Sequence, residues 1–244
     1  MEMRYTVPKE MPRGTHYGNN YWMVPSAKMN RFVTAFSNLE YYNIIMLEMS
    51  AKVEGYCEQP CELVVPVSEA DLKEKEKELQ KKTEDEEKHV IPDVYVLYKD
   101  GTEEIQEVKY LSELNKDDEK GERSRRQIKF EKQWCLEHGL RFALRTDELL
   151  IPNNYLISNL AFMHARVYRE GTFLNNDALR RLQIAFETGR KKVTVRDLTG
   201  ILGLSIADCW TVVSNLYYHG LLSLDMDGLL NQYTEVHLNG DKKV

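Results

Sequence analysis

Two acidic residues and one lysine form the pattern in this sequence that could carry chemistry. Asp93 follows a proline, thirteen residues separate it from Glu107, and Lys109 comes two positions after Glu107. Carboxylates are hard oxygen ligands that suit Mg²⁺ or Mn²⁺, and residues two apart on a strand share one face. Asp93 and Glu107 could therefore hold a cation against a phosphate, while Lys109 orients or helps deprotonate an attacking water. These are the parts needed to hydrolyse a phosphodiester.

The same pattern also has a structural explanation, as a turn aspartate and an exposed salt bridge on a strand. The surrounding residues favour the catalytic interpretation. Residues 94–98 are β-branched and aromatic, residues 99–101 read Lys-Asp-Gly, and residues 105–110 alternate in polarity. This order predicts a β-hairpin, which would bring Asp93 on one strand close to Glu107 on the next.

A capped helix is expected before the hairpin. Ser37 and Glu40 have the spacing of a capping box, and apolar residues then recur at helical spacing, at Leu39, Tyr42, Met46 and Met49. Glu40 therefore has two explanations. It caps the helix, or it is a further acidic member of the site that holds a second metal directly or through water.

Other elements complete a mixed α/β core. A charged helix is predicted over residues 124–138, ending before Gly139, and a strand over residues 140–144. Between the first helix and the hairpin, residues 71–88 are mostly Glu, Lys and Gln. This composition is typical of a solvated helix or a mobile insertion, so residues 68–89 are predicted to interrupt the core.

Over residues 25–165 the sequence resembles TnsA, the endonuclease subunit of heteromeric cut-and-paste transposases. Several blocks agree in order and spacing, namely residues 28–31, 37–40, 53–60, 91–93, 107–109, 139–147 and 159–160. The resemblance implies a PD-(D/E)xK nuclease. Its catalytic domain would span residues 1–150 and contain a restriction-endonuclease-like mixed sheet flanked by helices.

The resemblance also implies roles for individual residues. The active site would consist of Glu40, Asp93, Glu107 and Lys109. The cofactor would be Mg²⁺ or Mn²⁺, and the ligands would be Asp93, Glu107, the backbone carbonyl of Val108, and Glu40. Gln59 matches a recurrent Gln-Pro that would support the backbone or contact DNA near the site, although the start of a strand explains it nearly as well.

The expected partners follow from the same resemblance. The protein would cut the 5′ side of transposon ends in DNA, while a DDE-type transposase resembling TnsB cuts the 3′ side. An ATPase regulator resembling TnsC would be a second protein partner. The alternatives are a stand-alone restriction- or repair-type nuclease, a noncatalytic DNA- or protein-binding adaptor, and a winged-helix transcription regulator.

The last third of the chain has a different pattern. Thr194 and Ser205 each open a short capped helix, and a glycine turn separates the two helices. A small hairpin over residues 221–238 follows, so residues 151–244 are predicted to form a small α+β winged-helix domain. The second helix, residues 206–219, contains no Lys or Arg. Because such side chains normally read the major groove, this domain is expected to bind mainly protein.

The charge balance bears on DNA binding. The chain carries 33 basic and 39 acidic residues, a net charge of −6, whereas nonspecific phosphate contacts usually need a basic surface. The best candidate for such a surface is a stripe at helical spacing, Arg125, Lys129 and Lys132. Neighbouring acidic residues would equally well neutralise it on a solvated helix, namely Glu119, Glu122 and Glu131. We therefore expect a nuclease that binds DNA weakly alone and is recruited by a DNA-bound partner.

Bulk features point to a cytoplasmic protein, most simply in the bacterial cytosol. No stretch approaches the ~20 apolar residues of a membrane helix, and no apolar signal region is visible at the start. The four cysteines match no zinc spacing and do not suggest a disulfide scaffold.

Overall fold

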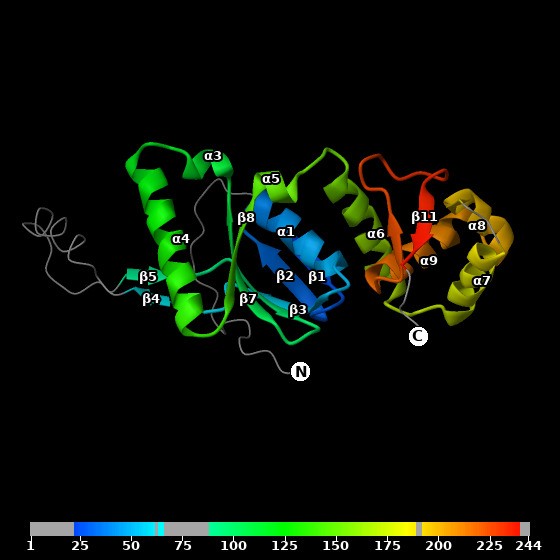
Figure 1. Ribbon diagram of the computed structural model, residues 1–244, viewed down its shortest axis with the longest axis horizontal. Coiled ribbons are helices and arrows are strands. Elements are labelled where there is room, and N and C mark those ends of the chain that lie inside the picture. Colours follow the sequence, from blue (N-terminus) through cyan, green and yellow to red (C-terminus); the bar gives the residue numbers. More distant parts are fainter. Residues whose placement is uncertain (1–21, 62, 66–87, 189–191, 240–244) are drawn as a thin grey trace, which may run out of the picture.

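The computed structural model describes residues 22–61, 63–65, 88–188 and 192–239 (Figure 1). Most of the predicted charged insertion, residues 68–87, lies outside these ranges. Its last two positions, Lys88 and His89, belong to strand β5 (Lys88–Val90), which pairs antiparallel with β4 (Leu63–Val65). Regular structure therefore resumes before the predicted end of the insertion.

A four-stranded mixed sheet carries the hairpin with the predicted site residues. Its strands are, in order across the sheet, β3 (Val53–Glu58), β6 (Val94–Tyr98), β7 (Glu103–Lys109) and β8 (Arg141–Thr146). β6 is antiparallel to both of its neighbours, and β8 is parallel to β7. The predicted β6–β7 hairpin is confirmed, and Gly101 in its turn has a φ of 85°, which glycine adopts without strain.

Helix α4 (Glu119–Glu137) connects β7 to β8 and packs beside the sheet, preceded by the short α3 (Leu111–Leu114) (Figure 1). α4 begins five residues earlier than predicted because Asp118 caps it. Oδ1 of Asp118 accepts a hydrogen bond of 2.8 Å from the N–H of Gly121. Only glycine fits at position 121, since a Cβ there would lie 2.2 Å from the carbonyl oxygen of Lys116.

Helix α1 (Asn38–Met49) lies on the other side of the sheet from α4, against a hairpin of β1 (Trp22–Ser26) and β2 (Arg31–Ala35) (Figure 1). The predicted cap is confirmed, because Oγ of Ser37 accepts a hydrogen bond of 3.1 Å from the N–H of Glu40. α1 is buried on more sides than its predicted apolar stripe requires, because helix α6 (Leu156–Glu170) also packs against it.

The short helix α5 (Asp147–Leu150) follows β8 and packs against β8 and α1 (Figure 1). The remaining elements form the other end of the molecule (Figure 1). They are α7 (Asn176–Glu187), β9 (Val193–Thr194), α8 (Val195–Leu202), α9 (Ile206–Tyr218), β10 (Leu222–Leu224) and β11 (Glu235–Leu238). The three strands form an antiparallel sheet in the order β10-β11-β9. The predicted caps are confirmed, since Thr194 forms a capping box with Asp197 at α8 and Ser205 caps α9.

One apolar core runs from the β1–β2 hairpin through α1 and α6 into α8 and α9. Phe162 of α6 meets Trp210 of α9 edge to face, with 5.2 Å between the ring centres, a favourable aromatic geometry. A second, smaller apolar cluster lies between the sheet and α4. The sheet is thus covered by α4 on one side and by α1 on the other, and α6 packs against α1.

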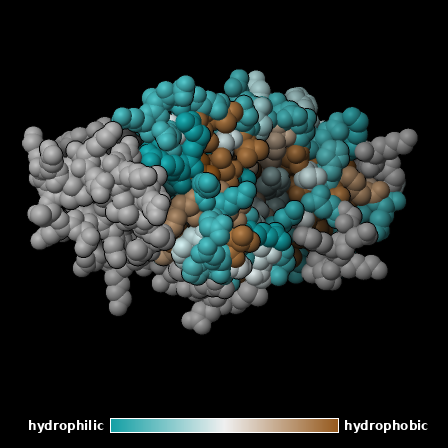
Figure 2. Space-filling view, turned by 60° about the vertical axis from the view of Figure 1, so that its left-hand side comes forward, coloured by the Kyte–Doolittle hydropathy of each residue, from teal (hydrophilic) through white to brown (hydrophobic). Residues whose placement is uncertain are grey.

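The described surface mixes hydrophilic and apolar areas. Figure 2 shows hydrophobic residues in the middle of one face, with hydrophilic residues around them. The most exposed large apolar side chains in the described ranges are Phe173, Leu136, Leu229, Tyr233 and Met23. None of the described helices has the length and apolar character needed to cross a lipid bilayer.

Candidate active site

Asp93 lies immediately before β6, where the hairpin places it beside β7. Its Oδ2 atom accepts a hydrogen bond of 2.7 Å from the backbone N–H of Val108. Its carbonyl oxygen accepts another, of 2.9 Å, from the N–H of Gln59. Gln59 has a φ of 44°, an uncommon backbone conformation for a residue with a side chain. Asp93 is therefore held between the end of β3 and the end of β7.

Glu107 and Lys109 lie on the same face of β7, as their spacing predicted. The Glu107 side chain is fully buried, and its Oε1 atom is 2.5 Å from Nζ of Lys109. The second carboxylate oxygen, Oε2, is buried and accepts no hydrogen bond from the described residues. The Glu107 carboxyl lies within hydrogen-bonding reach of the carboxyls of Asp93 and Glu131, and such a group needs a shared proton or a bound cation.

Burial controls the protonation of these groups. Burial raises the pKa of Glu107 well above its usual range, and the charge of Asp93 raises it further. The pKa of Asp93 is also raised by burial, against the opposing effects of Lys109 and the Val108 N–H. For Lys109, burial by itself lowers the pKa, but the charges of Asp93 and Glu107 outweigh it and raise the pKa. The Lys109 ammonium therefore stays protonated and suits orienting water or stabilising negative charge better than taking up a proton.

Glu40 combines a capping contact with an electrostatic link to the site. Its Oε2 atom accepts a hydrogen bond of 3.0 Å from the backbone N–H of Phe36, one residue before the cap residue that a standard capping box would use. Burial raises the pKa of Glu40 to about 7, and the charge of Asp93 contributes to the rise. The structure thus brings Glu40 into the electrostatic field of Asp93, and the two explanations of Glu40 are compatible.

Two residues of α4 that the sequence analysis did not place in the site also face it. Nε2 of Gln127 donates hydrogen bonds to Oε1 of Glu107, at 2.8 Å, and to Oε1 of Glu131, at 2.9 Å. Glu131 is fully buried, and burial raises its pKa to about 7. The expectation that Glu131 neutralises a solvated stripe is therefore wrong, because its carboxyl lies inside the protein next to Glu107.

The inward face of α4 gives a weak sequence signal because it is polar. The positions that point inward follow helical spacing, at Gly121, Ser124, Gln127, Glu131 and Cys135. A search for apolar residues at that spacing passes over this face. A Gln four residues before a Glu does not mark this face either, because Gln133 and Glu137 repeat that spacing on the exposed side of the same helix.

The predicted DNA-binding residues have mixed surroundings. Gln59 lies beside Asp93 through its backbone, as described above. Arg125, Lys129 and Lys132 are exposed on α4. Nη1 of Arg125 donates to the carbonyl oxygens of Leu114, at 2.6 Å, and Lys116, at 2.9 Å. Arg125 thus supports the α3–α4 turn, and contacts of the three cations with DNA stay a prediction.

The fit of a divalent cation rests on few residues. Within the described ranges, no group of three or more His, Cys, Asp and Glu side chains is arranged to hold a metal. Asp93 and Glu107 nevertheless suit one, because two carboxylates are buried close together and Oε2 of Glu107 accepts no hydrogen bond from the described residues. A bound cation is the kind of charge that makes such burial favourable.

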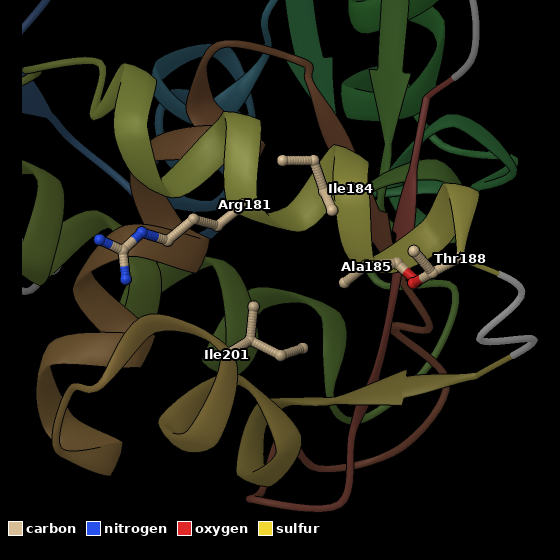
Figure 3. A pocket seen from close by; sticks show the side chains of 5 residues that line it. All are labelled: Arg181, Ile184, Ala185, Thr188 and Ile201. Carbon is tan, nitrogen blue, oxygen red and sulfur yellow. The ribbon is translucent and has the colours of Figure 1, made fainter.

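A pocket elsewhere in the protein does not include any of these residues. It lies between α7 and α8, has a volume of about 410 Å³, and is lined by Arg181, Ile184, Ala185, Thr188 and Ile201 (Figure 3). The catalytic candidates are on the sheet and on α1, so the chemistry proposed for them does not use this pocket.

Comparison with known proteins matches the segment that carries the candidate site. Residues 50–147 match the family model described as "TnsA-like endonuclease N terminal". The matched segment contains the whole four-stranded sheet and α4, and with them Asp93, Glu107 and Lys109, whereas Glu40 lies before it. No curated protein matches the chain.

Proposed function

We propose, from the match of residues 50–147 to the TnsA-like endonuclease N-terminal model, that this chain is the metal-dependent endonuclease subunit of a cut-and-paste transposase. It hydrolyses one phosphodiester at the 5′ side of each transposon end, together with a DDE-type partner resembling TnsB. The observation that carries this proposal is the arrangement on one hairpin: Asp93 hydrogen-bonds to the backbone of β7, and Glu107 and Lys109 form an ion pair on that strand.

In this proposal, Asp93 and Glu107 hold Mg²⁺ or Mn²⁺, with the carbonyl of Val108 as a further ligand. When bound, the cation would polarise the phosphate and increase the acidity of a bound water. The Lys109 ammonium orients the attacking water and stabilises the negative charge that develops on the phosphate. Glu40 assists from the start of α1, either at a second cation or through water.

The partner proposals rest on the C-terminal elements. We propose that residues 151–244 form a winged-helix domain, with α8 and α9 as the paired helices and β10–β11 as the wing. α9 lacks Lys and Arg, and eight of its thirteen residues are buried. A helix that reads bases needs exposed polar or basic side chains, so this domain is proposed to dock the TnsB-like transposase and a TnsC-like ATPase. The catalytic domain then comprises residues 1–150.

The test is cleavage of DNA that contains a transposon end, with Mg²⁺, in the presence and absence of the partner transposase. The wild-type protein with its partner should nick the 5′ side, and Asp93→Ala should abolish that nick. Asp177→Ala is the matched control, because Asp177 is an exposed aspartate on α7 and should not affect cleavage.

Each other outcome contradicts a defined part of the proposal. Nicking that survives Asp93→Ala would remove Asp93 from the active site. Cleavage of arbitrary DNA by the protein alone would favour a stand-alone nuclease. Absence of cleavage with the partner and either Mg²⁺ or Mn²⁺ would favour a noncatalytic adaptor.

A further inference from the structure

Gln127, which is half-buried, and Glu131, which is fully buried, contact the candidate site but have no role in the hydrolysis proposed above. Together with Glu107 they form a chain in which one amide nitrogen bridges two carboxylates, at 2.8 and 2.9 Å. Glu107 and Glu131 are fully buried, and each has one oxygen that accepts no hydrogen bond from the described residues. The two carboxyls lie within hydrogen-bonding reach of each other. Two adjacent buried carboxyls need a shared proton or a bound cation between them, so the arrangement suits a cation site.

The geometry restricts how the Glu107 carboxylate can turn. Nζ of Lys109 and Nε2 of Gln127 both contact Oε1 of Glu107. One donor comes from the same strand, and the other comes from α4, across the β7–α4 connection. Two donors on the same oxygen fix the plane of the carboxylate and leave Oε2 available to a ligand. Without Gln127, only the flexible Lys109 side chain would hold that orientation.

Glu131 determines which end of the Gln127 amide points toward Glu107. A glutamine amide has a donor end and an acceptor end. Because Oε1 of Glu107 and Oε1 of Glu131 both accept from Nε2, the two carboxyls together keep the donor end of the amide directed at both of them. Removing the acceptor at position 131 would allow the amide to rotate and present its oxygen to Glu107.

We propose that Gln127 is a positioning residue for Glu107 and that Glu131 orients the Gln127 amide. This inference rests on the proposed function, since it takes Glu107 as a ligand of the divalent cation. Residues that hydrogen-bond to metal ligands typically change metal affinity by about 10- to 100-fold when they are removed. The pair should therefore matter for cation binding before any DNA is present.

The chain offers a matched control on the same helix. Gln133 and Glu137 have the same four-residue spacing, and Nε2 of Gln133 donates a hydrogen bond of 2.8 Å to Oε1 of Glu137. Both residues are exposed and lie outside the site. Substituting Gln133 removes a Gln–Glu hydrogen bond from the same helix but leaves the surroundings of Glu107 unchanged.

The experiment measures Mn²⁺ binding to the full chain by electron paramagnetic resonance, without DNA. Gln127→Ala should weaken Mn²⁺ affinity by about 10- to 100-fold. Glu131→Leu, which removes the acceptor at similar volume, should weaken it in the same direction but by less, because the Gln127 amide can still donate to Glu107 in one of its two orientations. Gln133→Ala should leave it unchanged. In a Glu107→Gln background, Gln127→Ala should have no further effect, because the residue that it positions is no longer a carboxylate.

Wild-type affinity in Gln127→Ala would overturn the positioning role, even if Asp93→Ala behaves as proposed. If Gln127→Ala fails to fold, Glu131→Leu decides, and wild-type affinity in that variant overturns the proposal. An equal further loss from Gln127→Ala in the Glu107→Gln background would also overturn it. Wild-type protein that neither binds Mn²⁺ nor nicks transposon ends would instead refute the proposed function, and this inference with it.

Discussion

Replacing Glu40 with glutamine should stabilise the metal-free protein at alkaline pH, although Glu40 is a proposed site residue. Burial and the charge of Asp93 raise the pKa of Glu40 from 4.5 to about 7. The folded state therefore binds this proton more tightly than the unfolded chain. The resulting contribution to the free energy of unfolding is fully present below pH 4.5 and is lost as the pH rises through about 7.

The magnitude follows from the pKa values. A rise from 4.5 to about 7 corresponds to about 3 kcal/mol, at about 1.4 kcal/mol for each pKa unit. Most of this is lost between pH 5 and pH 8. Glutamine has nearly the same size, keeps an oxygen for the Phe36 N–H, and does not ionise. Between these pH values, the unfolding free energy of Glu40→Gln should therefore rise relative to wild type by about 2 to 3 kcal/mol.

Urea unfolding at pH 5, 6, 7 and 8 with EDTA measures this difference. Taking the difference between variant and wild type cancels groups that titrate equally in both, such as His164, whose pKa is lowered by burial. Glu137→Gln, which replaces an exposed glutamate, is the matched control. Adding Mg²⁺ should reduce the effect, because a bound cation stabilises the ionised carboxyls. A Glu40→Gln difference that is constant with pH, or that moves in favour of wild type, would refute the reasoning.

Four further predictions concern other parts of the protein. Lys109→Ala should lower the single-turnover rate of nicking by about 10²- to 10³-fold. Lys109→Arg should nick faster than Lys109→Ala because it keeps the positive charge, and equal rates in the two variants would contradict the role of that charge. Gly121→Ala should lower the free energy of unfolding by about 1 to 3 kcal/mol, because its Cβ would overlap the Lys116 carbonyl. Gly200→Ala in α8, where a Cβ meets nothing within 4 Å, should instead be neutral or stabilising, and thermal unfolding compares the two. Transposon-end DNA should bind the isolated protein weakly and with a shallow salt dependence, as measured by fluorescence anisotropy, and tight salt-sensitive binding would refute recruitment by a partner. Glu48→Gln should lower the free energy of unfolding, measured in urea, by about 2 to 4 kcal/mol. The reason is that the fully buried Glu48 carboxylate accepts hydrogen bonds from Ser26, Ala27, Lys28 and Tyr56. The exposed control Glu54→Gln should leave the free energy of unfolding unchanged.

The hairpin that carries Asp93, Glu107 and Lys109 could be predicted because its determinants are local. β-branched and aromatic residues, a Lys-Asp-Gly turn and the alternation along β7 act within about 15 residues of each other. The same holds for the caps at Ser37, Thr194 and Ser205, where a side chain bonds to a backbone group three residues away. Such signals depend on neighbouring residues, so a single sequence contains them.

The sequence by itself therefore determined the β6–β7 hairpin, the following strand β8, the caps and the likeness to TnsA. Only the tertiary structure decided which face of α4 is inside. In the folded protein Glu131 faces inward, Gln127 lies between Glu131 and Glu107, and Arg125 hydrogen-bonds to the turn between α3 and α4. Some of these contacts join residues 9 to 20 positions apart, and the others lie on a polar buried face. Such contacts produce no periodic apolar pattern in the sequence. The burial of a polar side chain depends on its partners across the fold rather than on its neighbours in the sequence.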